Sequence, residues 1–241
     1  GRVFYQYAKT IIQTRDEAFQ AVEQFRNKLA GQLILAASSI PGTYVLPKMI
    51  GSFKMAHPES QIVLQISDTS GAAELVADGR AEAGIVGARW RHPKLDFQEI
   101  ITDKLLLITS PEHRWATQRK TIKPDELVEE PFVVREAGSG TRMLIKQVME
   151  EHGLNIGRLN VVAELGSTEA VKQSVKDGMG VSILSVLAVS DELRQGSLVA
   201  IEIDGIKFDR SLYLVQRKNR EPSPLCSAFI SHLEAECKIG A

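Results

Sequence analysis

Apolar and polar residues in the first thirty positions recur with the spacing of a long helix. Steps of four and three residues connect a row of apolar positions that only Arg15 interrupts. The positions of this row are Phe4, Ala8, Ile11, Arg15, Ala18, Val22, Phe25 and Leu29. Gly31 follows the row, as glycine often follows the last turn of a helix. The pattern predicts a helix that joins two subunits or domains; a helix packed on its own domain is the alternative.

From residue 32 onward, short apolar runs alternate with helical patterns. This β-α-β-α-β order predicts a mostly parallel sheet with helices on both faces. The predicted strands are 32–38, 61–67 and 81–88, and the helices between them are 46–58 and 71–80. Two further apolar runs, 95–100 and 104–110, predict two strands separated by a turn at Thr102 and Asp103.

A second series of strands and helices begins at residue 131. Its predicted strands are 131–136, 160–165, 180–185 and 198–203, and its predicted helices are 141–152, 168–178 and 186–196. A long strand over 210–218 and a helix over 224–239 complete the chain. The two long strands 104–110 and 210–216 would join two α/β subdomains. Subdomains joined by two crossovers leave a cleft between them, and such clefts open and close on ligands.

Composition and charge narrow the class of protein. The chain has 241 residues, 44% of them hydrophobic and 24% charged, which is ordinary for a soluble protein of one large or two modest domains. A net charge of −1 argues against a nucleic-acid-binding surface spread over the chain. Neither a membrane-spanning run nor a signal peptide is recognisable, so we expect a cytoplasmic protein with no membrane partner. Cys226 and Cys237 are then expected to be free thiols.

Small hydroxyl residues follow the predicted strands in both halves. Each of these residues is a good helix cap, so capping alone explains any single turn. Their recurrence at several turns that face one cleft favours a polar pocket, because ligands of open α/β sheets lie at the carboxyl ends of strands. The polar residues of these turns include Ser38, Ser39, Asp68, Thr69, Arg89, Ser139, Thr141, Ser167 and Thr168.

The stretch "REAGSGTR", residues 135–142, resembles an anion-binding loop. It lacks the spacing and the lysine of a phosphate loop, and it also lacks the G-x-S-x-G spacing of a nucleophile elbow. No histidine obviously partners Ser139, and zinc motifs are absent. A turn at a helix N-terminus remains, and it suits a carboxylate, sulfate-like or phosphate-like group. Arg142 either adds a charge-assisted bond, stays solvated or pairs with Glu136. We predict no catalytic residue, no metal, no cofactor and no enzyme activity.

Several motifs occur in an order that resembles LysR-type transcriptional regulators. They are "GRVFYQYAKTIIQTRDEA", "GQLILAAS", "LPKMIGSFKMAHPES", "LVADGRAEAGIVG", "LLLITSPEHRWA", "PFVVREAGSGTR" and "VKDGMGVSILS". The first is similar to the family's linker helix, and the others are similar to its effector-binding domain. The resemblance covers essentially the whole chain.

The resemblance implies two Rossmann-like subdomains, of the periplasmic-binding-protein type, that hold a small effector between them. It implies a linker or dimerisation helix over 1–30, a first subdomain over 31–108 and 210–241, and a second over 109–209. It also implies dimers or tetramers, and promoter DNA bound only through a winged helix-turn-helix preceding this chain. We expect a small anionic effector, either an organic acid or an oxyanion of sulfur or phosphorus. The expected contacts are Ser38, Ser39, Thr69, Gly87, Arg89, Ser139, Gly140, Thr141, Ser167 and Thr168.

Two other functions compete with this ligand sensor. A two-lobed solute-binding protein for a small anion shares the architecture, but the helix over the first thirty residues argues against it. An enzyme would need a nucleophile, base and orienting group that the motifs do not provide. In the sensor, the effector must bind two arrangements of the subdomains or subunits with different affinity.

Overall fold

A computed structural model describes most of the chain. The described residues are 1, 4–5, 7–8, 11–12, 14–15, 18, 29–118 and 121–239. Those between Phe4 and Ala18 are helical, and the large apolar side chains among them are exposed. Val22 and Phe25 of the predicted helical row lie outside the described residues, so the row is described only in part.

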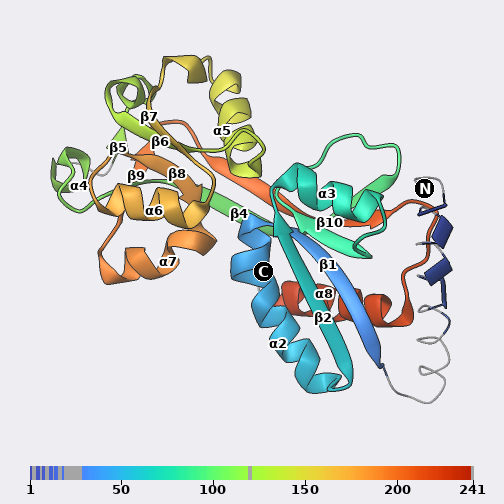
Figure 1. Cartoon of the computed structure of the whole chain (residues 1–241). Coiled ribbons are helices and arrows are strands. Elements are labelled where there is room, and N and C mark those ends of the chain that lie inside the picture. Colours follow the sequence, from blue (N-terminus) through green and yellow to red (C-terminus); the bar gives the residue numbers. More distant parts are fainter. Residues whose placement is uncertain are drawn as a thin grey trace.

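The first half of the molecule is a sheet between two helical layers (Figure 1). Strand β1 pairs in parallel with β2 and with β3. Alternate residues of β1 face opposite layers: Leu33 and Leu35 pack with α2 and α8, whereas Ala36 packs with α3. The elements of this half are β1 (Gly31–Ser38), α2 (Leu46–Ala56), β2 (Ser60–Ser67), α3 (Thr69–Ala77), β3 (Ala83–Val86) and α8 (Pro224–Ile239).

Two long strands run from the first half into the second (Figure 1). They are β4 (Leu95–Thr109) and β10 (Phe208–Arg217), which pair with each other in antiparallel fashion. Beyond this pairing, β10 borders β3 at one end of the ladder, and β4 borders strands of the second half at the other end.

The turn predicted at Thr102 and Asp103 is wrong, because β4 is continuous there. Thr102 pairs with Ser211, and Asp103 pairs with Arg210. The register shifts instead near Ile100, where β4 holds one residue more than β10. A Thr-Asp pair between apolar runs is typical of a turn, but the carboxylate of Asp103 is buried against a guanidinium of the neighbouring strand. That tertiary contact keeps a polar residue inside the strand.

The second half has its own strands, helices and apolar core. Strands β8 and β9 pair with β4, and β6 pairs in parallel with β7. The elements of this half are α4 (Arg114–Gln118), β5 (Thr121–Ile122), β6 (Pro131–Arg135), α5 (Gly140–Glu151), β7 (Asn160–Leu165), α6 (Thr168–Lys176), β8 (Ser182–Ser185), α7 (Val186–Gln195) and β9 (Val199–Ile203), with short 3-10 turns at Pro124–Glu129 and Ile156–Arg158. Two of four apolar clusters lie mainly in this half, and two lie mainly in the first.

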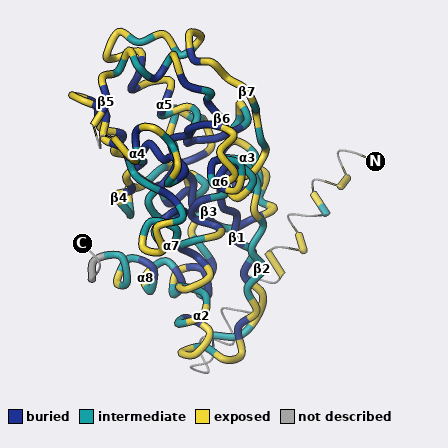
Figure 2. The backbone as a smooth tube through the Cα atoms, turned by 90° about the vertical axis from the view of Figure 1, so that its left-hand side faces the viewer, coloured by how far each residue is buried: buried dark blue, intermediate teal, exposed yellow. Residues whose placement is uncertain are grey.

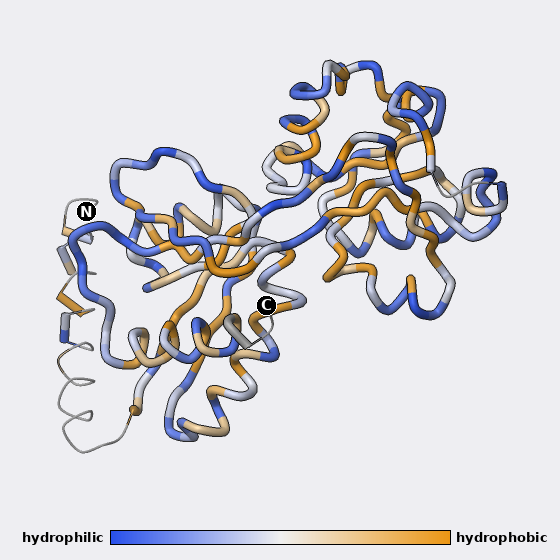
Figure 3. The backbone as a smooth tube through the Cα atoms, turned by 180° about the vertical axis from the view of Figure 1, so that it is seen from behind, coloured by the Kyte–Doolittle hydropathy of each residue, from blue (hydrophilic) through white to orange (hydrophobic). Residues whose placement is uncertain are grey.

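Buried residues concentrate in the middle of each half, while outer turns and outer helix faces are exposed (Figure 2). The hydropathy of the chain follows the same arrangement, with the hydrophobic segments inside both halves (Figure 3). None of the described helices is long and apolar enough to span a membrane. The result is two α/β halves joined by two strands, which confirms the predicted fold class.

Candidate functional site

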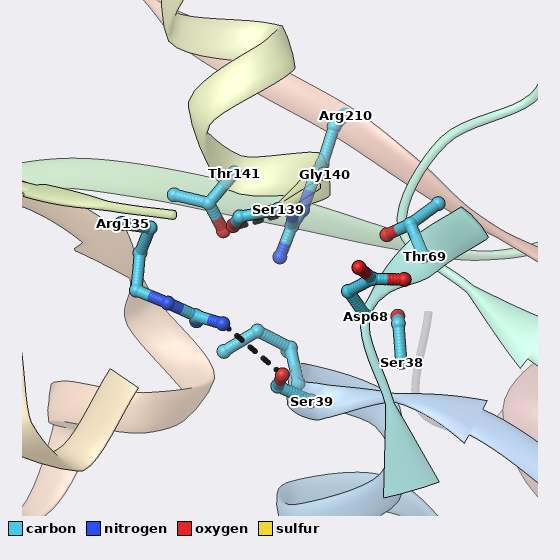
Figure 4. A pocket seen from close by; sticks show the side chains of 10 residues that line it. Ser38, Ser39, Asp68, Thr69, Arg135, Ser139, Gly140, Thr141 and Arg210 are labelled. Carbon is cyan, nitrogen blue, oxygen red and sulfur yellow. Dashed lines mark hydrogen bonds between the residues drawn. The ribbon is translucent and has the colours of Figure 1, made fainter. Parts of the chain in front are cut away.

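A small polar cavity lies where the two halves meet (Figure 4). Its empty space is about 230 Å³, part of which is open to solvent. The residues that line it come from both halves and from one crossover strand: Ser38, Ser39, Ile40, Asp68, Thr69, Arg135, Ser139, Gly140, Thr141 and Arg210. A ligand held here would contact both halves at once.

The first half contributes two strand-to-helix turns to this cavity. Strand β1 ends at Ser38, and the helix after it includes a π-helical turn over Pro41–Val45, a feature frequent at functional sites. Strand β2 ends at Ser67, and Asp68 caps α3 by accepting a hydrogen bond from Gly71 N to its Oδ1 at 2.6 Å. The hydroxyls of Ser38 and Thr69 are buried at the ends of these strands.

The second half contributes the N-terminus of α5. Ser139 is the capping residue of this helix, but its side chain makes no capping hydrogen bond. By contrast, Ser167 caps α6 by accepting a hydrogen bond from Ala170 N. Helix capping therefore explains Ser167 and does not explain the position of the Ser139 hydroxyl. The first N–H groups of α5 have no carbonyl partner inside the helix and attract negative charge.

Arg135, the last residue of β6, connects the walls of the cavity. Its Nη2 donates to Ser39 Oγ at 3.2 Å across the cleft, and its Nη1 donates to Thr168 Oγ1. Its Nε and Nη2 also donate to the two carboxylate oxygens of Glu136, each at 2.7 Å. Burial alone would raise the pKa of the Glu136 carboxyl, but the hydrogen bonds and charge of Arg135 outweigh it and lower that pKa.

Arg210 enters the cavity from the crossover strand β10. Its Nε donates to Asp103 Oδ2 at 2.8 Å, and Ser185 Oγ donates to the other oxygen of Asp103 at 2.8 Å. Its Nη1 donates to Thr141 Oγ1 at 3.2 Å. Burial lowers the pKa of the Arg210 guanidinium and the charge of Asp103 opposes this, but an arginine starts so high that it stays charged.

Two glycines let the halves approach closely. A Cβ on Gly138 would lie 2.3 Å from Asp68 Oδ2. A Cβ on Gly140 would lie 2.8 Å from Thr69 Oγ1 and 3.3 Å from the backbone of Gly87. A methyl group at Gly140 would press on the Gly87 backbone of the first half, and one at Gly138 would displace the Asp68 carboxylate. The cleft is therefore closed at this end.

A wider cleft adjoins the cavity and shares Ser39 and Asp68 with it. Its empty space is about 1040 Å³, open to solvent. Its other lining residues are Thr43, Tyr44, Ile66, Ser67, Glu136, Gly166, Ser167, Thr168 and Glu169. This cleft provides an entrance from solvent.

The structure brings most of the predicted contact residues together, but not all of them. Six line the small cavity: Ser38, Ser39, Thr69, Ser139, Gly140 and Thr141. Ser167 and Thr168 line the wider cleft, and Gly87 lies beside Arg210 Nη1. Arg89 instead lies over the ring of Tyr213, 5.4 Å from its centroid, and lines neither space. Arg142 binds Glu164 and the carbonyl of Arg135, so the predicted pairing with Glu136 is not observed.

Three charged residues of the cavity are missing from the predicted set. Asp68 follows a predicted strand and Arg135 is the next-to-last residue of another, so their position near a turn was a usable signal. Arg210 had no such signal, because it is the first residue of the strand predicted over 210–218. Its place in the cavity results from the pairing of β10 with β4.

Comparison with known proteins identifies the type of domain. A family model described as the LysR substrate binding domain matches residues 26–238. A probable RuBisCO transcriptional regulator of Cyanidioschyzon merolae is 33% identical over 236 residues, which make up 97% of this chain and 78% of that protein. A protein of the same description from Trichormus variabilis is 33% identical over 95% of this chain and 68% of its own length.

Solved structures show the same architecture. The regulatory domain of Synechocystis PCC6803 CcmR in complex with 2-PG has a TM-score of 0.78 and 27% identity, over 86% of this chain and 98% of that one. The effector binding domain of QuiR in complex with shikimate has a TM-score of 0.77 at 18% identity, over 87% of this chain and 98% of that one. The second likeness concerns the fold alone.

Proposed function

The chain belongs to the LysR substrate-binding domain family, and from this premise we propose that its cavity binds a small anionic effector. The two curated relatives described above are probable transcriptional regulators, and the chain is a ligand-sensing regulatory domain of that type. The proposal concerns the location of the ligand, its charge and the residues that hold it.

One observation supports a ligand of negative charge. Two buried guanidinium groups and the N-terminus of α5 meet in a cavity with little space. Guanidinium groups form charge-assisted hydrogen bonds with carboxylates and phosphates, and helix N-termini favour negative charge. The hydroxyls of Ser38, Thr69 and Ser139, which make no hydrogen bond to the described residues, supply further polar partners for a ligand. The related Synechocystis domain, described in complex with 2-PG, supports a small ligand in this type of domain.

The proposed contacts are narrower than the set expected from the sequence. Ser38, Ser39, Thr69, Ser139, Gly140 and Thr141 form the contact set together with Arg135 and Arg210. Thr168 acts by orienting Arg135, and Ser167 lines the entrance. Gly87 makes room for Arg210, and Arg89 takes no part.

We infer that the site binds its ligand without transforming it. In the described part of the chain, the hydrogen-bonded histidine rings contact groups outside the cavity. His113 contacts Glu130, and His232 contacts Ser52. Neither of these histidines therefore lies beside Ser139 to activate its hydroxyl.

The sequence-predicted division into 31–108 with 210–241, and 109–209, is kept as a proposal. The distribution of the four apolar clusters over two halves supports it. Ligand binding would stabilise the closed arrangement and change how subunits pack. Self-association through the helix over 1–30 is part of this proposal, and the exposed Phe4, Tyr7 and Ile11 support it. A monomer by sedimentation at tens of micromolar would contradict that part.

The test is a thermal-shift screen of carboxylic acids, phosphate esters and sulfur oxyanions, followed by calorimetry on the best ligand. The double variant Ser139→Ala/Thr141→Ala should weaken binding without unfolding the protein, because both hydroxyls face the cavity. Thr117→Ala, which removes an exposed hydroxyl in α4, is the matched control. An unchanged affinity in the double variant would reject this site.

A further inference from the structure

Asp68 is an unexpected residue in a cavity proposed for an anion. Its carboxylate lies with Ser38 and Thr69 on one side of the cavity, and the guanidinium of Arg135 enters from another side (Figure 4). A carboxylate only accepts hydrogen bonds, and it repels another anion at short distance. A ligand with acceptor groups alone would therefore bind poorly next to it.

Within the described part of the chain, one oxygen of Asp68 has a hydrogen-bond partner and the other has none. Oδ1 caps α3 through Gly71 N, at 2.6 Å. Oδ2 lies against the Cα side of Gly138, and no hydrogen bond reaches it from the residues that the structure describes. The carboxylate is thus fixed by the helix cap while its second oxygen has unused acceptor capacity.

The remaining groups divide the cavity into two chemically different parts. Arg135, Arg210 and the N-terminus of α5 donate hydrogen bonds and attract negative charge. Asp68 accepts hydrogen bonds, and none of the described residues donates one to its Oδ2. The hydroxyls of Ser38, Thr69 and Ser139 can donate or accept, so they do not select between ligands.

We propose that the ligand of this cavity is a small acid that also carries a hydroxyl or ammonium group, and that Asp68 accepts a hydrogen bond from that group. This inference rests on the proposed function, because it requires the acid group of the ligand to bind the arginines. Asp68 then discriminates between acids that differ in one donor. An acceptor that a bound ligand covers without pairing costs free energy, so an acid lacking the donor is rejected.

Asp68→Asn is a sharp test of this role. Asparagine is as good a helix cap as aspartate, so α3 keeps its N-terminus. The substitution turns the acceptor at Oδ2 into an N–H donor of nearly the same size. Asp204→Asn, at an exposed turn residue outside the cavity, makes the same change of charge and is the control.

The experiment compares acids of equal carbon length by calorimetry on the whole chain. The probes are acetate, glycolate and glycine; propionate, lactate and alanine; and succinate, malate and aspartate. In the native chain the best-binding series should favour the hydroxy or amino acid about tenfold or more over the plain acid. Asp68→Asn should reduce that ratio to about threefold or less, and Asp204→Asn should leave it unchanged. Preference for the hydroxy acid or for the amino acid identifies the donor.

The failures of the two proposals are distinguishable. Equal affinity for plain and donor-bearing acids, with binding lost in a folded Arg135→Gln variant, would overturn the role of Asp68 and leave the anion site standing. A preference that persists in Asp68→Asn would also overturn this role. Binding of no acid in this panel or in the thermal-shift screen, or binding indifferent to Arg135→Gln, would overturn the anion site and this inference with it.

Discussion

Two buried arginines reach the same cavity, but their carboxylate partners differ in how firmly they are held. Asp103, the partner of Arg210, has a side chain with 0% exposure and a second hydrogen bond from Ser185. Glu136, the partner of Arg135, has a side chain that is 26% exposed and borders the open cleft. The first pair lies between the crossover strands, whereas the second lies at the entrance.

This difference in burial indicates that the Asp103–Arg210 pair is part of the structural framework, whereas the Glu136–Arg135 pair can exchange partners. Removing Asp103 would leave a buried charge uncompensated, and no solvent could replace it. Glu136 can turn into solvent, which would free two donor groups of Arg135 for the acid group of a ligand. We therefore expect Glu136 to compete with the ligand and Asp103 to hold Arg210 in place.

The largest effect is expected at the framework pair. Asp103→Ala should lower the free energy of unfolding by about 3–5 kcal/mol, because it leaves the Arg210 guanidinium buried without a counter-charge. Urea unfolding followed by circular dichroism measures the change. Ser185→Ala, which removes only one hydrogen bond to Asp103, should cost about 1 kcal/mol. Equal losses in the two variants would show that the ion pair is not what holds the strands.

The next effect concerns the closed end of the cleft. In Gly140→Ala the new methyl group would press on Thr69 Oγ1 and the Gly87 backbone, so we expect a loss of about 1–3 kcal/mol in stability. Ligand affinity should fall as well, because the halves would close less completely. Thermal unfolding and calorimetry measure the two effects.

Gly51→Ala is the matched control for this glycine. A Cβ there meets nothing within 4 Å, and alanine favours a helix interior, so stability should stay the same or rise by up to ~1 kcal/mol. Unchanged ligand affinity in Gly140→Ala would contradict closure at this end.

A smaller effect is expected at the exchangeable pair. Glu136→Gln should raise the affinity for an anionic ligand about three- to tenfold, because it weakens a competitor for Arg135. The cost in stability should stay within about 1 kcal/mol, as for other partly exposed pairs. Calorimetry with the best acid of the screen measures the affinity.

Glu164→Gln serves as the control for Glu136→Gln. It also removes one carboxylate paired with an arginine, but outside the cavity. A lower affinity in Glu136→Gln would mean that Glu136 supports binding and does not oppose it.

The smallest effect is a pH dependence of stability. The pKa of Glu136 is lowered in the folded chain. Its contribution to the stability of the fold is therefore present above the ordinary carboxyl pKa, and it is lost as the pH falls through the pKa of the folded chain. The native chain should therefore lose slightly more stability than Glu136→Gln between about pH 5 and pH 3. Thermal unfolding across this range measures the difference, and parallel curves would rule out the contribution.

The fold was predictable because its elements carry local signals. Apolar runs of strand length and the glycines and hydroxyls between them predicted nearly every strand and helix to within a few residues. The short elements α4 and β5 had no predicted counterpart, and the turn predicted at Thr102 and Asp103 was wrong. Local sequence indicates a turn there, and only the ion pair with Arg210 explains why β4 continues.

The site was predictable where its residues follow strands in the sequence. Ser38, Ser39, Thr69 and the loop from Ser139 to Thr141 stand at the carboxyl ends of predicted strands, where parallel sheets gather their ligands. Arg89 stands at an equivalent position and still lies elsewhere, because its guanidinium lies over the ring of Tyr213.

The α/β class, the two series of elements and the family resemblance follow from the sequence, since they depend on residues close together along the chain. Tertiary structure alone decided that Arg210 enters the cavity and that Asp68 faces Gly138 across the cleft. Burial, ion pairing and strand pairing act between residues far apart in the sequence. No local pattern encodes the outcome of these interactions.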